Sequence, residues 1–357
     1  MAGVFRATRG FDCQWGLFMN RAPLTVVIPT YNRRHVVRDA IDSVLLQTLP
    51  PAQVVVIDDG SKDNTAEALR SYGGRISYVY QPNAGLSAAR NHGIRLATQP
   101  FVGFLDDDDV WHPHMVELQM ECFRRDPQLG LLGAERFDWP CREFAPVVED
   151  PTTRLRAVTW EQLVVRTLIQ VSSVIVRREV LERVGGFDET MKSSEDREWF
   201  LRVAEVARVA ELRLPLCGYR DTPGSMCKDP AAREPAMRQI LQRLDQKGAW
   251  RGRWLLRRKA YSYMHHTCSV VHAWAGDHVG AVRQGLKSLA AYPLPYRRDE
   301  VNMPLARPKR LAVNLLRLAR LKRRDGGSAG KPNPTGDALQ ALRRTSAERM
   351  PSLPSVA

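Results

Sequence analysis

The chain has no long apolar run. No stretch of about 18 apolar residues, the length that spans a bilayer, occurs among its 357 residues, so we expect no transmembrane helix. The N-terminal residues 1–20 include Arg6 and Arg9 but no continuous apolar core, which makes this segment a poor signal peptide. The expected location is therefore the cytoplasm, where the protein is free or peripheral on the inner face of the membrane.

Cysteine is sparse and scattered. The six cysteines stand at positions 13, 122, 141, 217, 227 and 268. None of them forms a CxxC pair or another spacing typical of a metal site, and reduced thiols are the expected state.

Acidic residues are almost missing from the last third of the chain. Residues 231–357 contain 25 Lys and Arg against 8 Asp and Glu (+17), whereas residues 1–230 contain 28 against 31 (−3), and the two sum to the formal net charge of +14. We therefore divide the chain into four parts. These are a lead-in (1–21), an α/β domain (22–230), a basic helical extension (231–325) and a tail that we expect to be disordered (326–357).

Apolar, β-branched runs alternate with helical spacings in the first half of the chain. The runs that predict strands are 24–28, 54–57, 76–80 and 101–105, and the helical patterns that follow them are 37–45, 65–71, 87–97 and 113–123. Continuous apolar strands alternating with helices predict a mostly parallel sheet with helices on both faces. In such sheets, ligands bind beyond the carboxyl ends of the strands.

Polar clusters follow three of these strands. The most unusual is Asp106–Asp109, four carboxylates within apolar sequence, whose mutual repulsion requires a positive charge nearby. A solvated acidic loop is one interpretation, and a calcium loop is another, although its glycine turn and wider ligand spacing are absent. The position after a buried strand favours a third, namely Mg²⁺ or Mn²⁺ held by one or two carboxylates and by the phosphates of a substrate.

Three further stretches have both a chemical and a structural interpretation. Asp58-Asp59 suits hydrogen bonds to a nucleobase or ribose, or a turn that caps a helix. Gly85 and Arg90 suit an anion at a helix start, which is a weak signal alone. Glu195-Asp196 suits a general base, or a favourable acidic first turn of a helix.

Taken in order, four segments resemble family 2 glycosyltransferases: TVVIPTYNR, VVVIDDGSKDNT, NAGLSAARNHGI and FVGFLDDDDVWHP. Two later segments, SSVIVRREVLERVGGFDE and SSEDREWFLRVAEVA, extend the resemblance to about residues 23–230. It implies a GT-A fold, an α/β, Rossmann-like fold with a mixed but mostly parallel sheet and helices on both faces. To this the chain adds its C-terminal helical extension. The resemblance also implies an enzyme that transfers a sugar from a nucleotide-diphosphate sugar to a hydroxyl group with inversion.

The resemblance assigns roles to residues of this chain. It implies that Asp106 and Asp108 hold Mg²⁺ or Mn²⁺ against the diphosphate, with Asp109 as an alternative ligand. It implies that Asp196 is the general base and that Glu195 is its neighbour in the catalytic pair. The implied nucleotide-sugar contacts are Pro29, Thr30, Tyr31, Asp59, Arg90 and Asp107, with Asp59 facing the base and Asp107 near the ribose.

Two segments depart from the family pattern. Thr222 stands where many members have a histidine, so the diphosphate contacts of the loop 219–230 are not carried over, although Ser225 is present. Residues 138–170 match nothing specific, and because this region usually shapes the acceptor site, the acceptor is unreadable. UDP is the expected nucleotide from its frequency in the family, with GDP and dTDP sugars left open.

The basic extension has a membrane interpretation. Residues 307–324 hold eight basic residues and no acidic one, and Leu311, Leu315, Leu318 and Leu321 form a stripe typical of a helix on an anionic membrane. The alternative is a helix packed on the catalytic domain. Nucleic acid is an unlikely partner because no binding module is recognisable.

Residues 254–274 predict an aromatic-rich core helix. Its His265, His266 and His272 lack carboxylate partners nearby in sequence, so we assign no metal there.

The expected acceptor is a glycan, a lipid-linked saccharide or another envelope saccharide. A nucleotidyltransferase is one alternative, but its glycine-rich signature and lysine are replaced here by PTYNRR at the end of the first strand. The other alternative is a relative that binds nucleotide or membrane without turnover.

Overall fold

The structure is a computed structural model, and it describes residues 21–141, 143–144, 146, 150–222, 228–296 and 305–326, with the side chains of 321–326 excepted. The predicted tail from residue 327, and all but the last residue of the predicted lead-in, lie outside these ranges.

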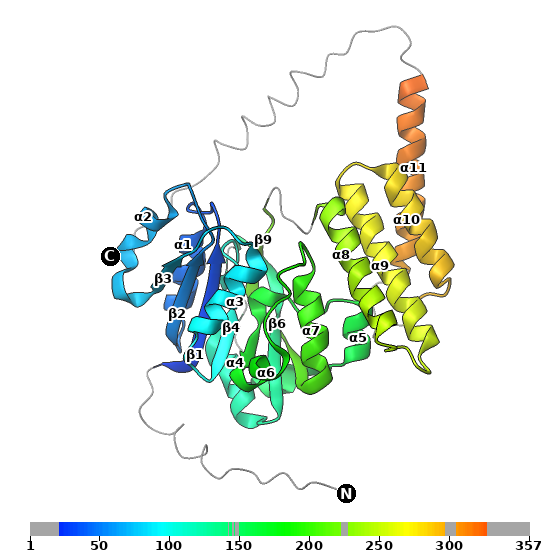
Figure 1. The fold of residues 1–357 in the computed structure, drawn as a ribbon. Coiled ribbons are helices and arrows are strands. Elements are labelled where there is room, and N and C mark those ends of the chain that lie inside the picture. The colour runs from blue at the N-terminus through cyan, green and yellow to red at the C-terminus, as the bar shows by residue number, and fades with distance from the viewer. Residues whose placement is uncertain are drawn as a thin grey trace, which may run out of the picture.

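A nine-stranded sheet lies at the centre of the molecule (Figure 1). Its strands are β1 (Ala22–Thr30), β2 (Pro51–Asp58), β3 (Ser77–Tyr80), β4 (Phe101–Phe104), β5 (Val110–Trp111), β6 (Leu129–Trp139), β7 (Leu155–Val158), β8 (Ile175–Arg177) and β9 (Arg208–Arg220). The order is β3-β2-β1-β4-β8-β6-β9-β5, and β7 pairs with β9. β1 to β4, β6 and β9 run in one direction, and β5, β7 and β8 run against them. The predicted mixed, mostly parallel sheet is confirmed.

Helices cover both faces of the sheet because successive side chains of each central strand point to opposite sides. Val26 of β1 packs in one core with α1 (Val37–Leu45) and α4 (Met115–Arg125). Its neighbour Val27 packs in the other core with α7 (Glu195–Val206) and α6 (Arg178–Val184). Three further helices complete this part of the chain: α2 (Thr65–Leu69), α3 (Leu86–Leu96) and α5 (Trp160–Val165).

The helical extension shares a core with the α/β domain. It consists of α8 (Pro230–Gln246), α9 (Trp254–Trp274), α10 (His278–Ala291) and α11 (Ala306–Gly326). Met237 of α8 and Met264 of α9 lie in the same apolar cluster as Trp199 of α7. α9 and α10 form a helical hairpin: the two are joined at Gly276, and the Asp277 side chain caps α10 by accepting from the Gly280 N–H at 2.8 Å. The division of the chain near residue 230 stays a prediction.

The first turn of α11 is anchored to this hairpin by a buried arginine. The Arg307 guanidinium stacks on the Tyr296 ring, 4.3 Å from its centroid, and donates to Ser262 Oγ at 2.8 Å and to the Tyr292 carbonyl. A buried guanidinium requires such partners because desolvating an unpaired charge is costly. Arg307 is therefore a packing residue.

This packing corrects the predicted stripe on residues 307–324. Leu311 is buried against the position of Gly285 on α10, whereas Leu315 and Leu316 are 47 % and 61 % exposed. Of these leucines, only Leu311 packs on the hairpin, and the other two lie on the exposed face of α11. The buried face of α11 also includes the polar side chains of Arg307 and Asn314. No helix in the described part of the chain combines the length and apolar character that crossing a bilayer requires.

His272 also differs from expectation. Its Nδ1 lies 2.8 Å from Asp277 Oδ2 and its Nε2 lies 3.1 Å from Glu234 Oε2. Asp277 lies in the turn after α9, only 5 residues from His272, so the expectation that His272 has no carboxylate nearby in sequence was wrong. Glu234 comes from α8, 38 residues away, and reaches His272 through the packing of the helices. The cluster links three segments of the bundle.

The contact between α3 and β1 predicts a stability effect. A Cβ added at Gly93 would lie 2.2 Å from Val27 Cγ1. We expect Gly93→Ala to lower the free energy of unfolding by about 1–3 kcal/mol through overpacking, measured by urea unfolding. Gly74→Ala is the matched control, since its Cβ would meet nothing within 4 Å, and it should change that energy by under about 1 kcal/mol. Equal midpoints for the two variants would contradict the close packing.

Candidate active site

The polar clusters that follow β1, β2 and β4 meet at one edge of the sheet. Thr30 and Asp58, the last residues of β1 and β2, are partners in register. The Asp59 N–H donates to the Thr30 carbonyl at 2.9 Å, and the Leu105 N–H donates to the Val27 carbonyl at 3.1 Å. Parallel strands place their carboxyl ends together, and here they collect carboxylates.

Asp58 is a turn residue. Its Oδ1 accepts from the Ser61 N–H at 2.7 Å, and its Oδ2 accepts from the Tyr78 hydroxyl at 2.6 Å. The structural interpretation of Asp58 therefore holds.

Asp59 holds the loop that precedes α3. Its Oδ1 accepts from Gln81 Nε2 at 2.7 Å and from the Ala84 N–H at 2.8 Å, and its Oδ2 accepts from the Gly85 N–H at 2.8 Å. The side chain is buried, and both oxygens have donors within the protein. A contact between Asp59 and a nucleobase stays a prediction.

The four consecutive aspartates alternate in environment. Asp107 and Asp109 are only 9 % and 4 % exposed, whereas the side chains of Asp106 and Asp108 are 27 % and 20 % exposed. Asp107 Oδ2 accepts from the Thr30 hydroxyl at 2.7 Å, yet burial and the neighbouring carboxylates raise the pKa of Asp107 to about 7. Burial and the charge of Asp106 raise the pKa of Asp109 to about 8. Asp106 and Asp108 are thus the accessible pair.

Asp108 is held by two elements that lie far apart in the sequence. Its Oδ2 accepts from Arg33 Nη1, beyond β1, and from the Thr222 hydroxyl, beyond β9, both at 2.7 Å. Arg220 Nε donates to the Asp108 carbonyl at 3.1 Å. Thr222, which stands where relatives often have a histidine, is therefore a direct partner of Asp108. Ser225 lies outside the described residues.

Asp106 is paired with the buried side chain of Arg90. Arg90 Nη2 lies 2.5 Å from Asp106 Oδ1, and Arg90 Nη1 lies 2.7 Å from Glu195 Oε1. Arg90 itself is 1 % exposed, and although burial lowers its pKa, the charges of Asp106 and Glu195 outweigh this and raise it. The guanidinium is thus shared by two carboxylates. A contact between Arg90 and a nucleotide sugar stays a prediction.

The acidic pair begins α7. Ser194, immediately before it, has φ 58°, a left-handed conformation that residues other than glycine rarely adopt. Glu195 is buried and Asp196 half-buried. Burial and the Glu195 charge raise the pKa of Asp196 to about 6, while the charges of Arg233 and Arg90 oppose this rise. Asp196 is therefore poised to exchange a proton near neutral pH.

Asp106 and Asp108 fit a divalent cation that shares its ligands with a phosphate. The recorded side-chain bonds of each use a single carboxylate oxygen, Oδ1 of Asp106 and Oδ2 of Asp108. Mg²⁺ and Mn²⁺ are commonly held by one or two carboxylates plus substrate phosphates. Within the ranges that the structure describes, no group of three or more His, Cys, Asp or Glu side chains is arranged to hold a metal, so a closed protein cage does not form there.

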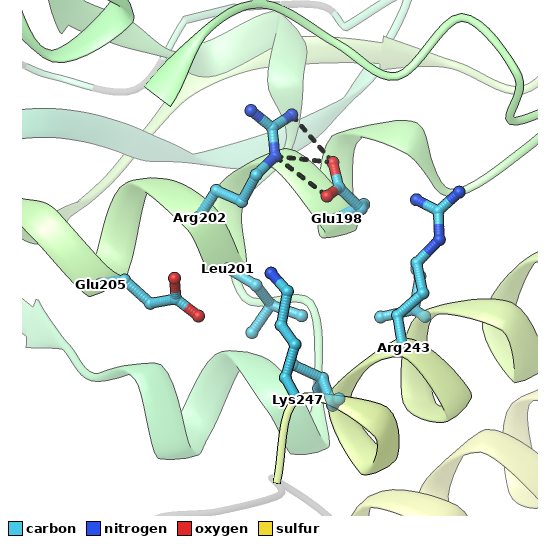
Figure 2. A pocket seen from close by; sticks show the side chains of 8 residues that line it. Glu198, Leu201, Arg202, Glu205, Arg243 and Lys247 are labelled. Carbon is cyan, nitrogen blue, oxygen red and sulfur yellow. Dashed lines mark hydrogen bonds and ion pairs between the residues drawn. The ribbon is translucent and has the colours of Figure 1, made fainter. Parts of the chain in front are cut away.

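A surface depression between α7 and α8 is separate from this edge (Figure 2). Glu198, Arg202 and Lys247 are among the residues that line it, and Arg202 binds Glu198 through Nε at 2.9 Å and Nη2 at 2.8 Å. None of the strand-end aspartates lines it. Its charges are of both signs and partly paired with one another, so it is not the candidate active site.

Sequence reasoning missed Arg33, Arg220 and Thr222 as partners of the aspartates. A partial signal existed, because Arg33 ends the segment TVVIPTYNR and Arg220 precedes the loop that departs from the family pattern. Arg33 reaches Asp108 because β1 lies next to β4, whereas Arg220 and Thr222 reach it because β9 returns to the same sheet edge. No local pattern displays either arrangement. Tyr31 follows β1 directly and is 46 % exposed, and its contact with a nucleotide sugar stays a prediction.

A family model described as glycosyl transferase family 2 matches residues 25–183. The uncharacterized glycosyltransferase EpsJ of Bacillus subtilis is 31% identical over 232 residues, which cover 62% of this chain and 67% of that protein. Uncharacterized glycosyltransferases of Rickettsia species also match, and this chain spans 60% or less of their length.

Solved structures show a similar fold. The mannosyltransferase PcManGT of Pyrobaculum calidifontis, in complex with GDP-Man and Mn²⁺, has a TM-score of 0.53 and 20% identity, covering 83% of this chain and 87% of that chain. S. aureus TarS 1–349, in complex with UDP-GlcNAc, has a TM-score of 0.51 and 18% identity, covering 77% of this chain and 93% of that chain. These likenesses confirm the predicted GT-A fold. With the family model and the match to EpsJ, they lead to the conclusion that the chain belongs to glycosyl transferase family 2.

Proposed function

We propose that this chain transfers a sugar from a nucleotide-diphosphate sugar, most readily a UDP-sugar, to a hydroxyl group of an envelope glycan or glycolipid, with inversion and with Mg²⁺ or Mn²⁺ as cofactor. The observation that carries the proposal is the junction at Arg90, which joins the accessible Asp106 to the acidic pair that includes Asp196. Complexes of fold neighbours with UDP-GlcNAc and with GDP-Man and Mn²⁺ support the donor class.

The donor would bind at the carboxyl edge of β1, β2 and β4. Asp106 and Asp108 would hold the cation, which when bound neutralises charge on the leaving diphosphate. Tyr31 presents an exposed ring at the end of β1, on which a nucleobase can stack. Pro29, Thr30, Asp59 and Asp107 are buried at the same strand ends and would form the wall of this donor site.

Asp196 would accept the proton of the acceptor hydroxyl. A half-buried carboxylate with a pKa near 6 is ionised at neutral pH and still basic enough to take a proton. Attack by that hydroxyl, from the side opposite the leaving diphosphate, inverts the configuration of the sugar. Positioned proton transfer of this kind contributes about 10²–10⁴-fold to the rate.

A relative that binds nucleotide without turnover is the second candidate. Asp106, Asp108 and Asp196 are all present and held by partners at one edge of the sheet, which favours the catalyst. A nucleotidyltransferase is less well supported, because Arg33 and its neighbours replace the glycine-rich loop that it requires.

The pH dependence of turnover follows from Asp196. The base must be unprotonated, so the rate of nucleoside-diphosphate release from UDP-GlcNAc, UDP-Glc or GDP-Man should be flat above a pH of about 6 and fall about tenfold per pH unit below it. The charged groups that face Asp196 are Glu195, Arg90, Arg233 and Arg197.

The matched variants are Asp196→Asn and Asp245→Asn. Asp196→Asn should lower the rate by about 10²–10⁴-fold and remove the acidic limb, which is the fall in rate below a pH of about 6. Asp245→Asn, which disrupts an ion pair on α8 with Arg257, should keep both the rate and the limb. Retention of the limb by Asp196→Asn would exclude Asp196 as the base.

Nucleotide binding should depend on the cation. A thermal-shift panel of UDP, GDP, dTDP, CDP and ADP, each with and without MnCl₂, should give one nucleotide that stabilises the protein only with Mn²⁺. At 100 times its Kd a ligand contributes about 2.7 kcal/mol, which is a shift of a few degrees. Asp108→Ala should remove the Mn²⁺-dependent part. If no nucleotide shifts the folded wild type, the donor assignment is wrong.

A lipid-linked acceptor agrees with the placement of α11. Figure 1 shows α11 extending past the α9–α10 hairpin on the side of the carboxyl ends of the central strands. Leu315 and Leu316 are exposed beside Arg317 and Arg320, a combination suited to an anionic bilayer surface. We therefore propose an anionic membrane surface as a partner that binds through α11.

Arg317→Gln with Arg320→Gln should weaken binding to phosphatidylserine-containing vesicles. Each basic residue near an anionic surface contributes about 1 kcal/mol, so the double variant should bind roughly 30-fold more weakly in a flotation assay. Arg70→Gln with Arg95→Gln, an equal loss of exposed charge immediately after α2 and on α3, is the control and should not alter flotation. Equal flotation of both double variants would remove α11 as the membrane contact.

A further inference from the structure

Among the residues that the structure describes, Arg90 alone forms ion pairs with both the cation side (Asp106) and the base side (Glu195) of the candidate site. Its guanidinium lies between Asp106 Oδ1 at 2.5 Å and Glu195 Oε1 at 2.7 Å, with its Cζ atom 5.2 Å from the centroid of the Phe187 ring. A fully buried guanidinium is stable only with partners of opposite charge, and planar Arg suits two carboxylates at once. The two acids are therefore electrostatically linked through one cation.

The backbone around this link is also fixed. Asn91, the next residue of α3, donates from Nδ2 to the Phe187 carbonyl at 2.8 Å and accepts the Phe187 N–H on Oδ1 at 2.7 Å. A Cβ at Gly186 would lie 2.1 Å from that Oδ1, so the close approach requires glycine. α3 is thus clamped to the segment that leads into α7, and Arg90 has little freedom to leave Glu195.

Glu195 is poorly placed to react directly. It is 8 % exposed and its Oε1 is engaged by Arg90, whereas the adjacent Asp196 is half-buried. While Glu195 is anionic, it shares the positive charge of Arg90 with Asp106. A neutral residue at 195 would leave that charge to Asp106 alone, which would make Asp106 a weaker ligand for a cation.

We propose that Glu195 is a positioning residue that acts through Arg90 to set the affinity of Asp106 for the divalent cation. This rests on the proposed function, in which Asp106 and Asp108 hold that cation. It assigns the two members of the acidic pair to different halves of the site: Asp196 to the acceptor, and Glu195 to the donor.

The test is Mn²⁺ binding by Glu195→Gln, measured from the EPR signal of free Mn²⁺ with UDP or GDP present. The amide oxygen of Gln can still accept from Arg90 Nη1, so the fold should persist. We expect Mn²⁺ to bind about 10- to 100-fold more weakly, the usual effect of altering a partner of a metal ligand. Asp196→Asn should bind Mn²⁺ like the wild type while losing turnover, and Glu198→Gln, on the same helix but paired with Arg202, should change neither.

A second variant tests whether Glu195 acts through Arg90. The lysine in Arg90→Lys lacks the planar guanidinium that binds two carboxylates at once, so this variant should weaken Mn²⁺ binding by itself. If Glu195 acts through Arg90, adding Glu195→Gln to Arg90→Lys should cause little further loss, because effects within one network are not additive. Full additivity of the two losses would overturn the route through Arg90.

The remaining outcomes separate this inference from the proposed function. If the wild type binds no Mn²⁺ with either nucleotide, the proposed metal dependence fails, and the role of Glu195 fails with it. If the wild type binds Mn²⁺ and Glu195→Gln binds it equally well, the positioning role alone is wrong. Loss of turnover by Glu195→Gln at native Mn²⁺ affinity would instead make Glu195 a direct participant.

Discussion

The crowding of carboxylates at one edge of a sheet is the constraint on which the rest of this structure depends. Asp106–Asp109 and the Glu195-Asp196 pair lie near one another, and buried carboxylates are costly without cations or donors close by. The protein meets this cost in two ways. Burial raises the pKa values of Asp107 and Asp109 to about 7 and about 8, which favours their uncharged forms, and Asp106 and Asp108 are each paired with an arginine.

The arginines arrive from distant parts of the chain, and the topology explains how. Arg33 lies 75 residues from Asp108, and Arg90 lies 105 residues from Glu195. β1 and β4 are adjacent and parallel, so the segment that follows β1 lies next to the aspartates that follow β4. The chain returns after β8 and α7 to form β9, which brings Thr222 to Asp108 across 114 residues. The central sheet therefore acts as the frame that holds charge partners in place.

Much of the fold and part of the site could be predicted from sequence, because both depend on local patterns. Glu195-Asp196 does lie in the acidic first turn of a helix, α7, because such a turn is readable locally. The strand ends were predictable approximately as well: the apolar runs 24–28 and 101–105 stop next to polar clusters, and β1 and β4 end at Thr30 and Phe104.

What escaped prediction depends on packing between distant segments. Arg307 looks like a membrane-facing cation in sequence, but it is buried because Tyr292 and Tyr296 provide a site for it after the hairpin forms. Thr222 appeared to be a lost histidine, and its bond to Asp108 depends on how β9 ends. Long-range charge pairs leave no periodic signal in the chain, so one partner cannot be predicted from the sequence around the other.

The helical extension is part of the same electrostatic arrangement. Burial and Glu195 raise the pKa of Asp196, and Arg233 of α8 opposes them together with Arg90 of α3. Without these cations, a carboxylate so placed would stay protonated further into the neutral range, where a base must be free to act. Because α8 shares its apolar core with α7, the position of Arg233 is fixed by the packing of Met237 and Ile240. A helix that lies outside the α/β sheet thus helps to set the proton affinity of a residue at its edge.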